Sequence, residues 1–185
     1  MFNNADRTTA IGQSINAYLK GQSQVDDHVI HLLFSANRWE AAQGMLADIE
    51  SGTTLIVDRY SYSGAVYSAA KDNPILDLEW AWLPEIGLPK PDVCVFLTVS
   101  PEVAKARGGF GEERYESDKM QGRVRELFEV LLQWAGEDNV LRVNADKELD
   151  AVESSIVAGI HEYLTLERLS NPIGKLKALK PTTGT

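Results

Sequence analysis

The sequence predicts an α/β fold built around a parallel sheet. Short runs rich in β-branched residues, at 53–57, 93–99 and 140–143, are typical of strands. The first two runs lack alternation of polar and apolar residues, and such strands are buried on both faces, as in a parallel sheet. Segments with helical periodicity separate the runs, and this order of elements indicates an α/β domain. The length, 185 residues, is that of one ordinary domain.

Two helices are predicted before the first strand. The first covers residues 9–20, and the second begins after Asp26 or Asp27, either of which can cap it, and runs to about Glu50. A glycine follows each helix, as is common after the last helical turn. The apolar face expected for the second helix consists of Val29, Leu32, Leu33, Ala36 and Trp39.

Two further helices follow the later strands. Ser100 and Pro101 supply a cap and a first helical residue after the second strand. After the third strand, beyond Asp146, apolar residues recur at helical spacing. These are Leu149, Val152, Ile156, Ile160 and Leu164. Residues 171–185 are predicted to form a mostly solvated tail, and local docking of its middle stays open.

Composition limits the partners and the compartment. Lys and Arg number 18 and Asp and Glu number 27, so the net charge of −9 opposes binding to nucleic acid or to an anionic membrane. A single cysteine, Cys94, excludes an internal disulfide. No apolar run approaches the roughly 18 residues of a membrane span, and no signal pattern opens the chain. We therefore expect an intracellular protein, in the cytoplasm with the nucleus as a second compartment, without nucleic-acid or membrane partners.

Two charged side chains follow the first predicted strand directly. Parallel α/β sheets bind ligands at the carboxyl ends of their strands, which is where Asp58 and Arg59 stand. The arginine fork suits phosphate, and the aspartate could hold a hydrated magnesium ion or orient the arginine. By itself the pair is more readily explained as an ordinary surface ion pair.

Residues 58–71, which contain this pair, closely resemble the signature of thymidylate kinases. Further matches to that family occur in the same order at residues 6–12, 31–40 and 87–92. The resemblance runs from about Arg7 to Leu179. It implies a three-layer P-loop nucleoside monophosphate kinase fold with a parallel sheet.

By this resemblance, residues 1–170 form a thymidylate kinase-like domain with a lid at about 106–118, followed by the tail. Family members open with a strand, a G-x-x-x-x-G-K-[ST] turn and a helix that grip phosphates, and these 185 residues lack that pattern. The resemblance thus implies an N-terminally truncated member whose missing strand would be central in the sheet. We expect impaired activity and poor folding of the chain as written.

A base-binding pair is expected on the second helix. Phe34 and Arg38 are four residues apart and project from one face. A core aromatic beside a snorkelling arginine explains the spacing. Stacking and hydrogen bonding to a flat pyrimidine explain it too. The resemblance implies that Phe34 stacks on thymine and that Arg38 bonds its edge.

The remaining roles also come from the resemblance. Arg7 and Arg59 would hold the monophosphate of dTMP, and Asp58 would hold Mg²⁺ directly or through water. Asp58, Arg59 and Arg107 carry the implied catalytic roles, and Arg107 would also contact ATP, the co-substrate. The other implied pocket positions are Ser63, Gly64, Tyr67, Tyr115 and Gln121.

The predicted function is transfer of the γ-phosphate of ATP to dTMP, giving dTDP for dTTP synthesis. A homodimer is expected where the full fold is present. Two alternatives stay open: a non-catalytic dTMP-binding or regulatory paralogue, and a deoxyribonucleoside kinase whose acceptor is a nucleoside.

Overall fold

The computed structural model describes residues 2–3, 7–71, 73–107, 118–136, 139–164 and 171–181. The chain divides into two compact units. The first unit comprises Met1–Pro89, Ser117–Ala135 and Lys175–Thr185, and the second comprises Lys90–Glu116 and Gly136–Gly174.

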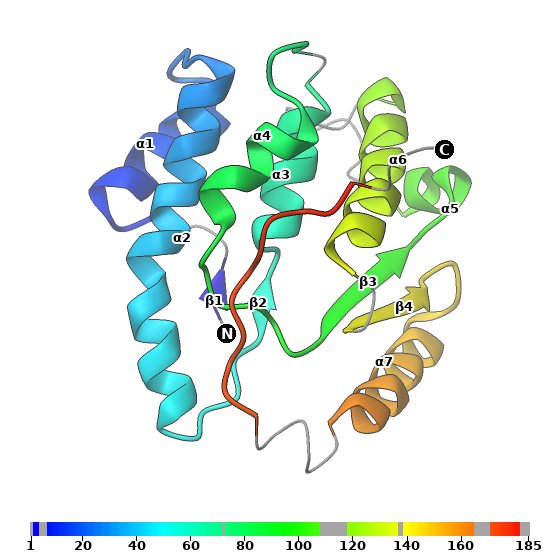
Figure 1. Ribbon diagram of the computed structural model, residues 1–185. Coiled ribbons are helices and arrows are strands. Elements are labelled where there is room, and N and C mark those ends of the chain that lie inside the picture. The colour runs from blue at the N-terminus through cyan, green and yellow to red at the C-terminus, as the bar shows by residue number, and fades with distance from the viewer. Residues whose placement is uncertain are drawn as a thin grey trace. The chain divides into compact units, whose positions relative to one another are not determined.

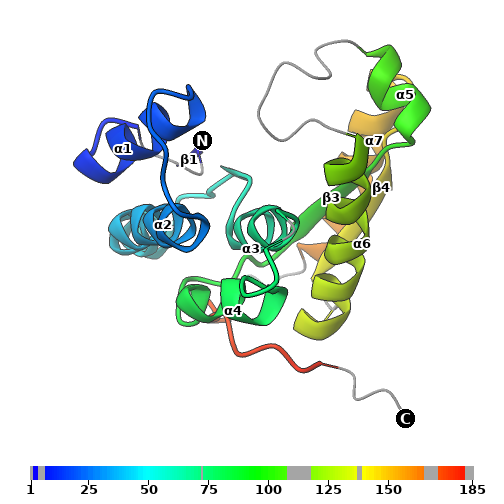
Figure 2. The same ribbon diagram turned by 90° about the horizontal axis from the view of Figure 1, so that it is seen from above.

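The first unit is mainly helical (Figure 1). Its helices are α1 (Ala10–Leu19), α2 (Asp27–Glu50), α3 (Ser61–Ala69), α4 (Leu78–Trp82), the 3₁₀ turn η1 (Leu83–Glu85) and α6 (Asp118–Ala135). Two short strands, β1 (Phe2–Asn3) and β2 (Val57–Asp58), pair in parallel. Figure 2 looks nearly along α2 and α3, and α3 packs against α2, α4 and α6.

The two predicted N-terminal helices are confirmed, together with their end signals. Thr9 caps α1 by accepting a hydrogen bond from the Gly12 amide, and Asp26 caps α2 by accepting one from the His28 amide. Gly21 and Gly52 follow the two helices with φ of +69° and +89°. Such left-handed conformations cost a glycine little, which is why it ends helices so often.

The predicted apolar face of α2 is wrong for three of its five residues. Val29, Leu32 and Trp39 are 49%, 45% and 45% exposed. The buried face carries the apolar residues Ile30, Ala42 and Met45 together with four polar ones, His31, Ser35, Asn37 and Arg38. Hydrophobic periodicity misplaced the face because buried polar side chains with hydrogen-bond partners occupy the positions that apolar residues usually mark.

The first predicted strand is shorter than expected. Only Val57–Asp58 adopts strand structure, with Val57 opposite Phe2 and Asp58 opposite Asn3. Burial on both faces is wrong for Ile56, which is 68% exposed. The described partner strand offers two residues, and β-rich composition does not form a ladder without a partner to bond.

The second unit holds the other two predicted strands. Strand β3 (Cys94–Thr98) pairs in parallel with β4 (Val140–Asn144), in register along their whole length. The predicted helices follow them as α5 (Pro101–Ala106), with Ser100 as its cap, and α7 (Leu149–Tyr163). The small core contains Val143, Ala145 and Val152, with Val95, Val99, Leu141 and Ile156 packed around it. Leu149 is exposed, so the predicted apolar series on α7 contributes mainly its middle members.

The middle of the predicted tail docks on the first unit. Leu176 is 3% exposed, and its backbone exchanges hydrogen bonds with Gly87 and Leu88. The Trp82 indole donates to the Lys177 carbonyl at 2.7 Å. In Figure 1 this red segment crosses beside the green α4. The expected solvation holds for neighbouring residues and fails at Leu176.

Candidate functional site

The end of β2 carries a strained arginine. Asp58 is exposed at the carboxyl end of the strand, and Arg59 next to it has φ of +60°. A left-handed conformation costs a non-glycine residue about 1–2 kcal/mol, so it persists where the surroundings enforce it. The Arg59 guanidinium lies 5.3 Å from the centroid of the Tyr67 ring. The structure thus brings two predicted site residues together.

Helices α2 and α3 meet where the base was predicted to bind. A Cβ atom on Gly64 would lie 2.7 Å and 2.9 Å from Nη2 and Nη1 of Arg38. Real Cβ atoms essentially never come so close, so only glycine leaves room for the guanidinium there. Ser63 precedes Gly64 on α3 and is half-buried, as is Phe34 on α2.

Arg38 is not a snorkelling side chain. It is 2% exposed and forms an ion pair with Glu85, which is 0% exposed. Its Nε donates to Glu85 Oε2 at 2.8 Å, and its Nη2 donates to Oε1 at 2.5 Å. Two parallel charge-assisted bonds fix both the distance and the plane of the guanidinium.

The turn that carries Glu85 is anchored to α2. The Pro84 carbonyl accepts hydrogen bonds from Ser35 Oγ at 3.1 Å and from Trp39 Nε1 at 2.8 Å. Gly87 follows with φ of +100°, and a Cβ there would approach the Trp39 ring to 3.1 Å. Successive turns of α2 therefore hold η1 in place.

Two titratable side chains lie near this ion pair. Burial, and next the negative charge of Glu85, raise the pKa of Tyr60 above its ordinary value. Burial lowers the pKa of His31 to about 4, although the Glu85 charge opposes that shift. His31 Nδ1 lies 2.8 Å from Ser68 Oγ, which ties α2 to α3. Both side chains are therefore neutral at physiological pH.

Other predicted residues lie around these helices. Arg7 is exposed before α1, with its Nη1 3.4 Å from Asn16 Oδ1. Gln121 lies in the first turn of α6, which packs on α3. Within the first unit, contacts therefore join Arg38 to Gly64 and Arg59 to Tyr67.

The remaining two predicted residues belong to the second unit. Arg107 ends α5, and its Nη2 donates to the carbonyls of Ala145 at 2.5 Å and Lys147 at 3.1 Å. Its guanidinium thus docks on the loop after β4. Tyr115 lies outside the described residues, as does most of the predicted lid.

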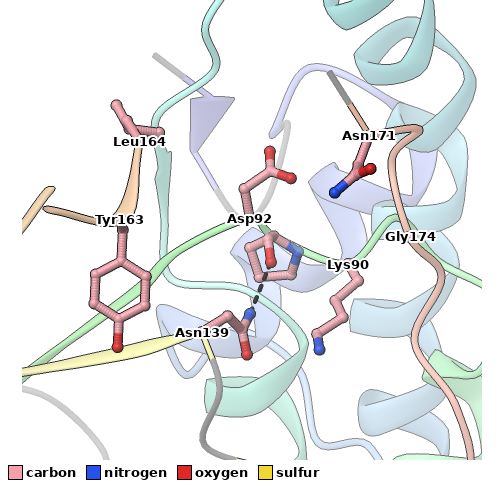
Figure 3. A pocket seen from close by; sticks show the side chains of 8 residues that line it. Lys90, Asp92, Asn139, Tyr163, Leu164, Asn171 and Gly174 are labelled. Atoms are coloured by element: carbon pink, nitrogen blue, oxygen red, sulfur yellow. Dashed lines mark hydrogen bonds between the residues drawn. The ribbon is translucent and has the colours of Figure 1, made fainter. Parts of the chain in front are cut away.

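A cavity of about 180 Å³ lies in the second unit (Figure 3). Its lining residues are Lys90, Pro91, Asp92, Asn139, Tyr163, Leu164, Asn171 and Gly174. Asn139 Nδ2 donates to the Pro91 carbonyl at 2.8 Å. Asp92 and Asn139 precede β3 and β4, so the cavity lies at the amino ends of the strands, opposite the end where ligands are expected. It contains none of the predicted site residues.

Sequence reasoning missed Glu85. Glu85 is separated from Arg38 by 47 positions, and no local spacing links them. Its position could have drawn attention to it, because Glu85 lies two residues before the matched segment 87–92. A carboxylate there looks like an ordinary surface residue until the turn is packed against α2.

Comparisons with known proteins agree on one family. The sequence model of the family described as thymidylate kinase matches residues 1–156. The thymidylate kinase of Arabidopsis thaliana is 50% identical over 151 residues, which is 82% of this chain and 55% of that protein. The thymidylate kinase of Schizosaccharomyces pombe is 46% identical over 171 residues, covering 89% of this chain and 80% of that protein.

A solved structure supports the same relationship. The structure of a thymidylate kinase from Candida albicans superposes with a TM-score of 0.84 at 31% identity, covering 95% of this chain and 85% of that one. The chain therefore spans about half the length of the Arabidopsis relative and most of the Schizosaccharomyces and Candida ones.

Proposed function

The chain belongs to the thymidylate kinase family, whose members phosphorylate dTMP to dTDP with ATP, and on that premise we propose that this protein performs the same transfer. The observation that carries the proposal is the contact between Arg38 and Gly64. It joins the predicted base-binding residue of α2 to the signature segment on α3, so the two halves of the predicted pocket are neighbours.

The proposed acceptor site binds the base and the phosphate with different groups. Phe34 stacks on thymine, and Arg38 donates to its edge. Arg59 and Arg7 hold the monophosphate, whose charge suits two guanidinium forks. Ser63, Gly64, Tyr67, Tyr115 and Gln121 complete the proposed pocket.

Phosphoryl transfer demands positioning and charge stabilisation more than covalent chemistry. Arg59 orients the acceptor oxygen for in-line attack on the γ-phosphate, and Arg107 stabilises the charge on the triphosphate. The left-handed backbone of Arg59 supports a functional role, because such strain concentrates at functional sites.

A magnesium ion is proposed near Asp58. Among the described residues, no three His, Cys, Asp or Glu side chains form a group able to hold a metal ion. Mg²⁺ does not need such a group, because it commonly binds one or two carboxylates together with waters and substrate phosphates. The exposed Asp58 carboxylate at the end of β2 fits that mode. When bound, the ion neutralises phosphate charge.

We further propose a homodimer that buries the exposed apolar residues of α2. Val29, Leu32 and Trp39 recur on one face, and contiguous exposed apolar surface is typical of association sites. The cytoplasm and nucleus stay the proposed compartments, without nucleic-acid or membrane partners. None of the described helices is both long and apolar enough to cross a membrane.

Calorimetry and a coupled assay of ADP release test the proposed function. We expect dTMP to bind more tightly than AMP, GMP or thymidine, and to stimulate ADP release in a protein that also carries the phosphate-gripping turn absent from these 185 residues. Replacing Arg59 with Ala should weaken the binding of dTMP by about 10- to 100-fold, which corresponds to the loss of one charge-assisted contact. The binding of thymidine should weaken far less. The matched control, Arg125→Ala, removes an exposed arginine of α6. Equal affinity for dTMP and the purine monophosphates would contradict the proposal.

A further inference from the structure

The orientation of Arg38 is set by three different elements. Its own helix, α2, supplies the side chain, Gly64 of α3 packs against the guanidinium, and Glu85 of η1 bonds it through Nε and Nη2. An arginine side chain ordinarily samples many rotamers. Here the plane is fixed by the bidentate bonds, and the close approach at Gly64 fixes its depth.

The ion pair is poorly explained as a source of stability alone. Both partners are almost fully buried, with 1% and 0% of their side chains exposed. The free-energy cost of removing two charges from water offsets most of the stabilisation from their attraction. A protein with a well-packed apolar pair in their place is often as stable. The best-attested use of such pairs is to specify one arrangement among several.

From this geometry we propose that Glu85 is a positioning residue for base recognition, holding Arg38 so that its N–H donors meet a carbonyl at C4 of a pyrimidine nucleotide. The inference rests on the proposed function. A guanidinium carries only donors. Held rigidly, it favours the 4-carbonyl of dTMP or dUMP and disfavours the 4-amino group of dCMP, whose hydrogens would face other hydrogens. A mobile arginine could turn away from that amino group and would discriminate less.

The anchoring of η1 supports this role. Ser35, three residues before Arg38, and Trp39, the residue directly after it, both donate to the carbonyl of Pro84, the residue before Glu85. The carboxylate is thus held by the same helix as the arginine. A positioning group must itself be fixed to transmit orientation.

The test is base selectivity in Glu85→Gln. The carboxamide keeps the size of the side chain but removes the charge and places an N–H₂ group against the guanidinium. We expect the ratio of dTMP to dCMP affinity, measured by calorimetry, to fall about 10- to 100-fold, as for loss of a charge-assisted hydrogen bond. Glu85→Asp keeps the charge with a shorter reach and should restore part of the ratio. The matched control is Glu79→Gln, an exposed glutamate of α4.

If Glu85 were purely structural, its replacement would weaken the binding of dTMP and of dCMP alike. An unchanged ratio of dTMP to dCMP affinity in Glu85→Gln or Glu85→Asp would therefore overturn the inference. Circular dichroism shows whether each variant folds. If one variant does not fold, the affinity ratio of the other still tests the inference. Failure of the proposed function is separate, since it would appear in the unmodified protein as an absence of preference for dTMP over purine monophosphates.

Discussion

At the scale of single residues, the buried face of α2 is partly polar. Arg38 pairs with Glu85, Ser35 donates to the Pro84 carbonyl, and His31 lies against Ser68. Each of these contacts replaces a hydrogen bond lost to water, which makes burial of the polar groups tolerable, although His31 Nε2 has no hydrogen-bond partner among the described residues.

His31 should make stability depend on pH. Its pKa is about 4 in the folded protein and 6.5 when unfolded, so the unfolded chain binds the proton first as pH falls. Stability is then fully present above pH 6.5 and declines toward pH 4, by up to about 3 kcal/mol. The free energy of unfolding, measured by urea denaturation at pH 7 and pH 4.5, should fall less between the two pH values in His31→Gln than in the unmodified protein. The exposed His161, changed to Gln, should leave the loss unchanged, and equal losses in all three proteins would contradict the assignment.

At the scale of elements, residues 175–177 form an extended segment, called the strap below, that packs on the rest of the first unit. It adds an antiparallel bridge between Pro89 and Lys175 and receives the indole of Trp82 at the Lys177 carbonyl. The strap therefore contacts the residues that follow η1, the element that carries Glu85. A segment predicted to be solvated contributes to the packing behind the candidate site.

Leu176→Ala should destabilise the first unit by about 2–4 kcal/mol, because it removes a buried side chain and leaves a cavity. Lys177→Ala is the matched control: its side chain is exposed, and the carbonyl that Trp82 bonds is retained. Thermal and urea melts measure both variants. Similar stability for the two would mean that Leu176 is not packed as the structure has it.

At the scale of the whole molecule, exposed apolar side chains on α2 remain after the first unit has formed its own core. Val29 and Leu32 are adjacent on the helix surface, as residues three apart are. Association with a second copy would remove this surface from water, a gain of roughly 25 cal/mol per Å² of apolar area.

Leu32→Glu should therefore convert the proposed dimer into a monomer in sedimentation velocity, since a buried charge without a partner opposes association. Leu149→Glu is the control, because Leu149 is 77% exposed on α7 of the second unit. Loss of the dimer in both variants, or in neither, would place the interface elsewhere.

The sequence by itself determined the ends of α1 and α2, the start of α5, the two longer strands, the α/β class and the family. These features depend on local chemistry, such as the caps at Thr9, Asp26 and Ser100, or on long matched segments such as residues 58–71. It also supplied the candidate residues of α2 and α3. The measurements above test their proposed roles in binding dTMP.

Only the tertiary structure decided which face of α2 is buried, how long β2 is, where Leu176 packs and that Glu85 meets Arg38. Each of these depends on contacts between residues distant in the chain, which spacing cannot report. The apolar face was misread because polar residues were buried with their partners, and β2 was overestimated because strand length is set by the partner. Burial and pairing are properties of the packed molecule, and the free energy that decides them comes from surfaces that the sequence does not place side by side.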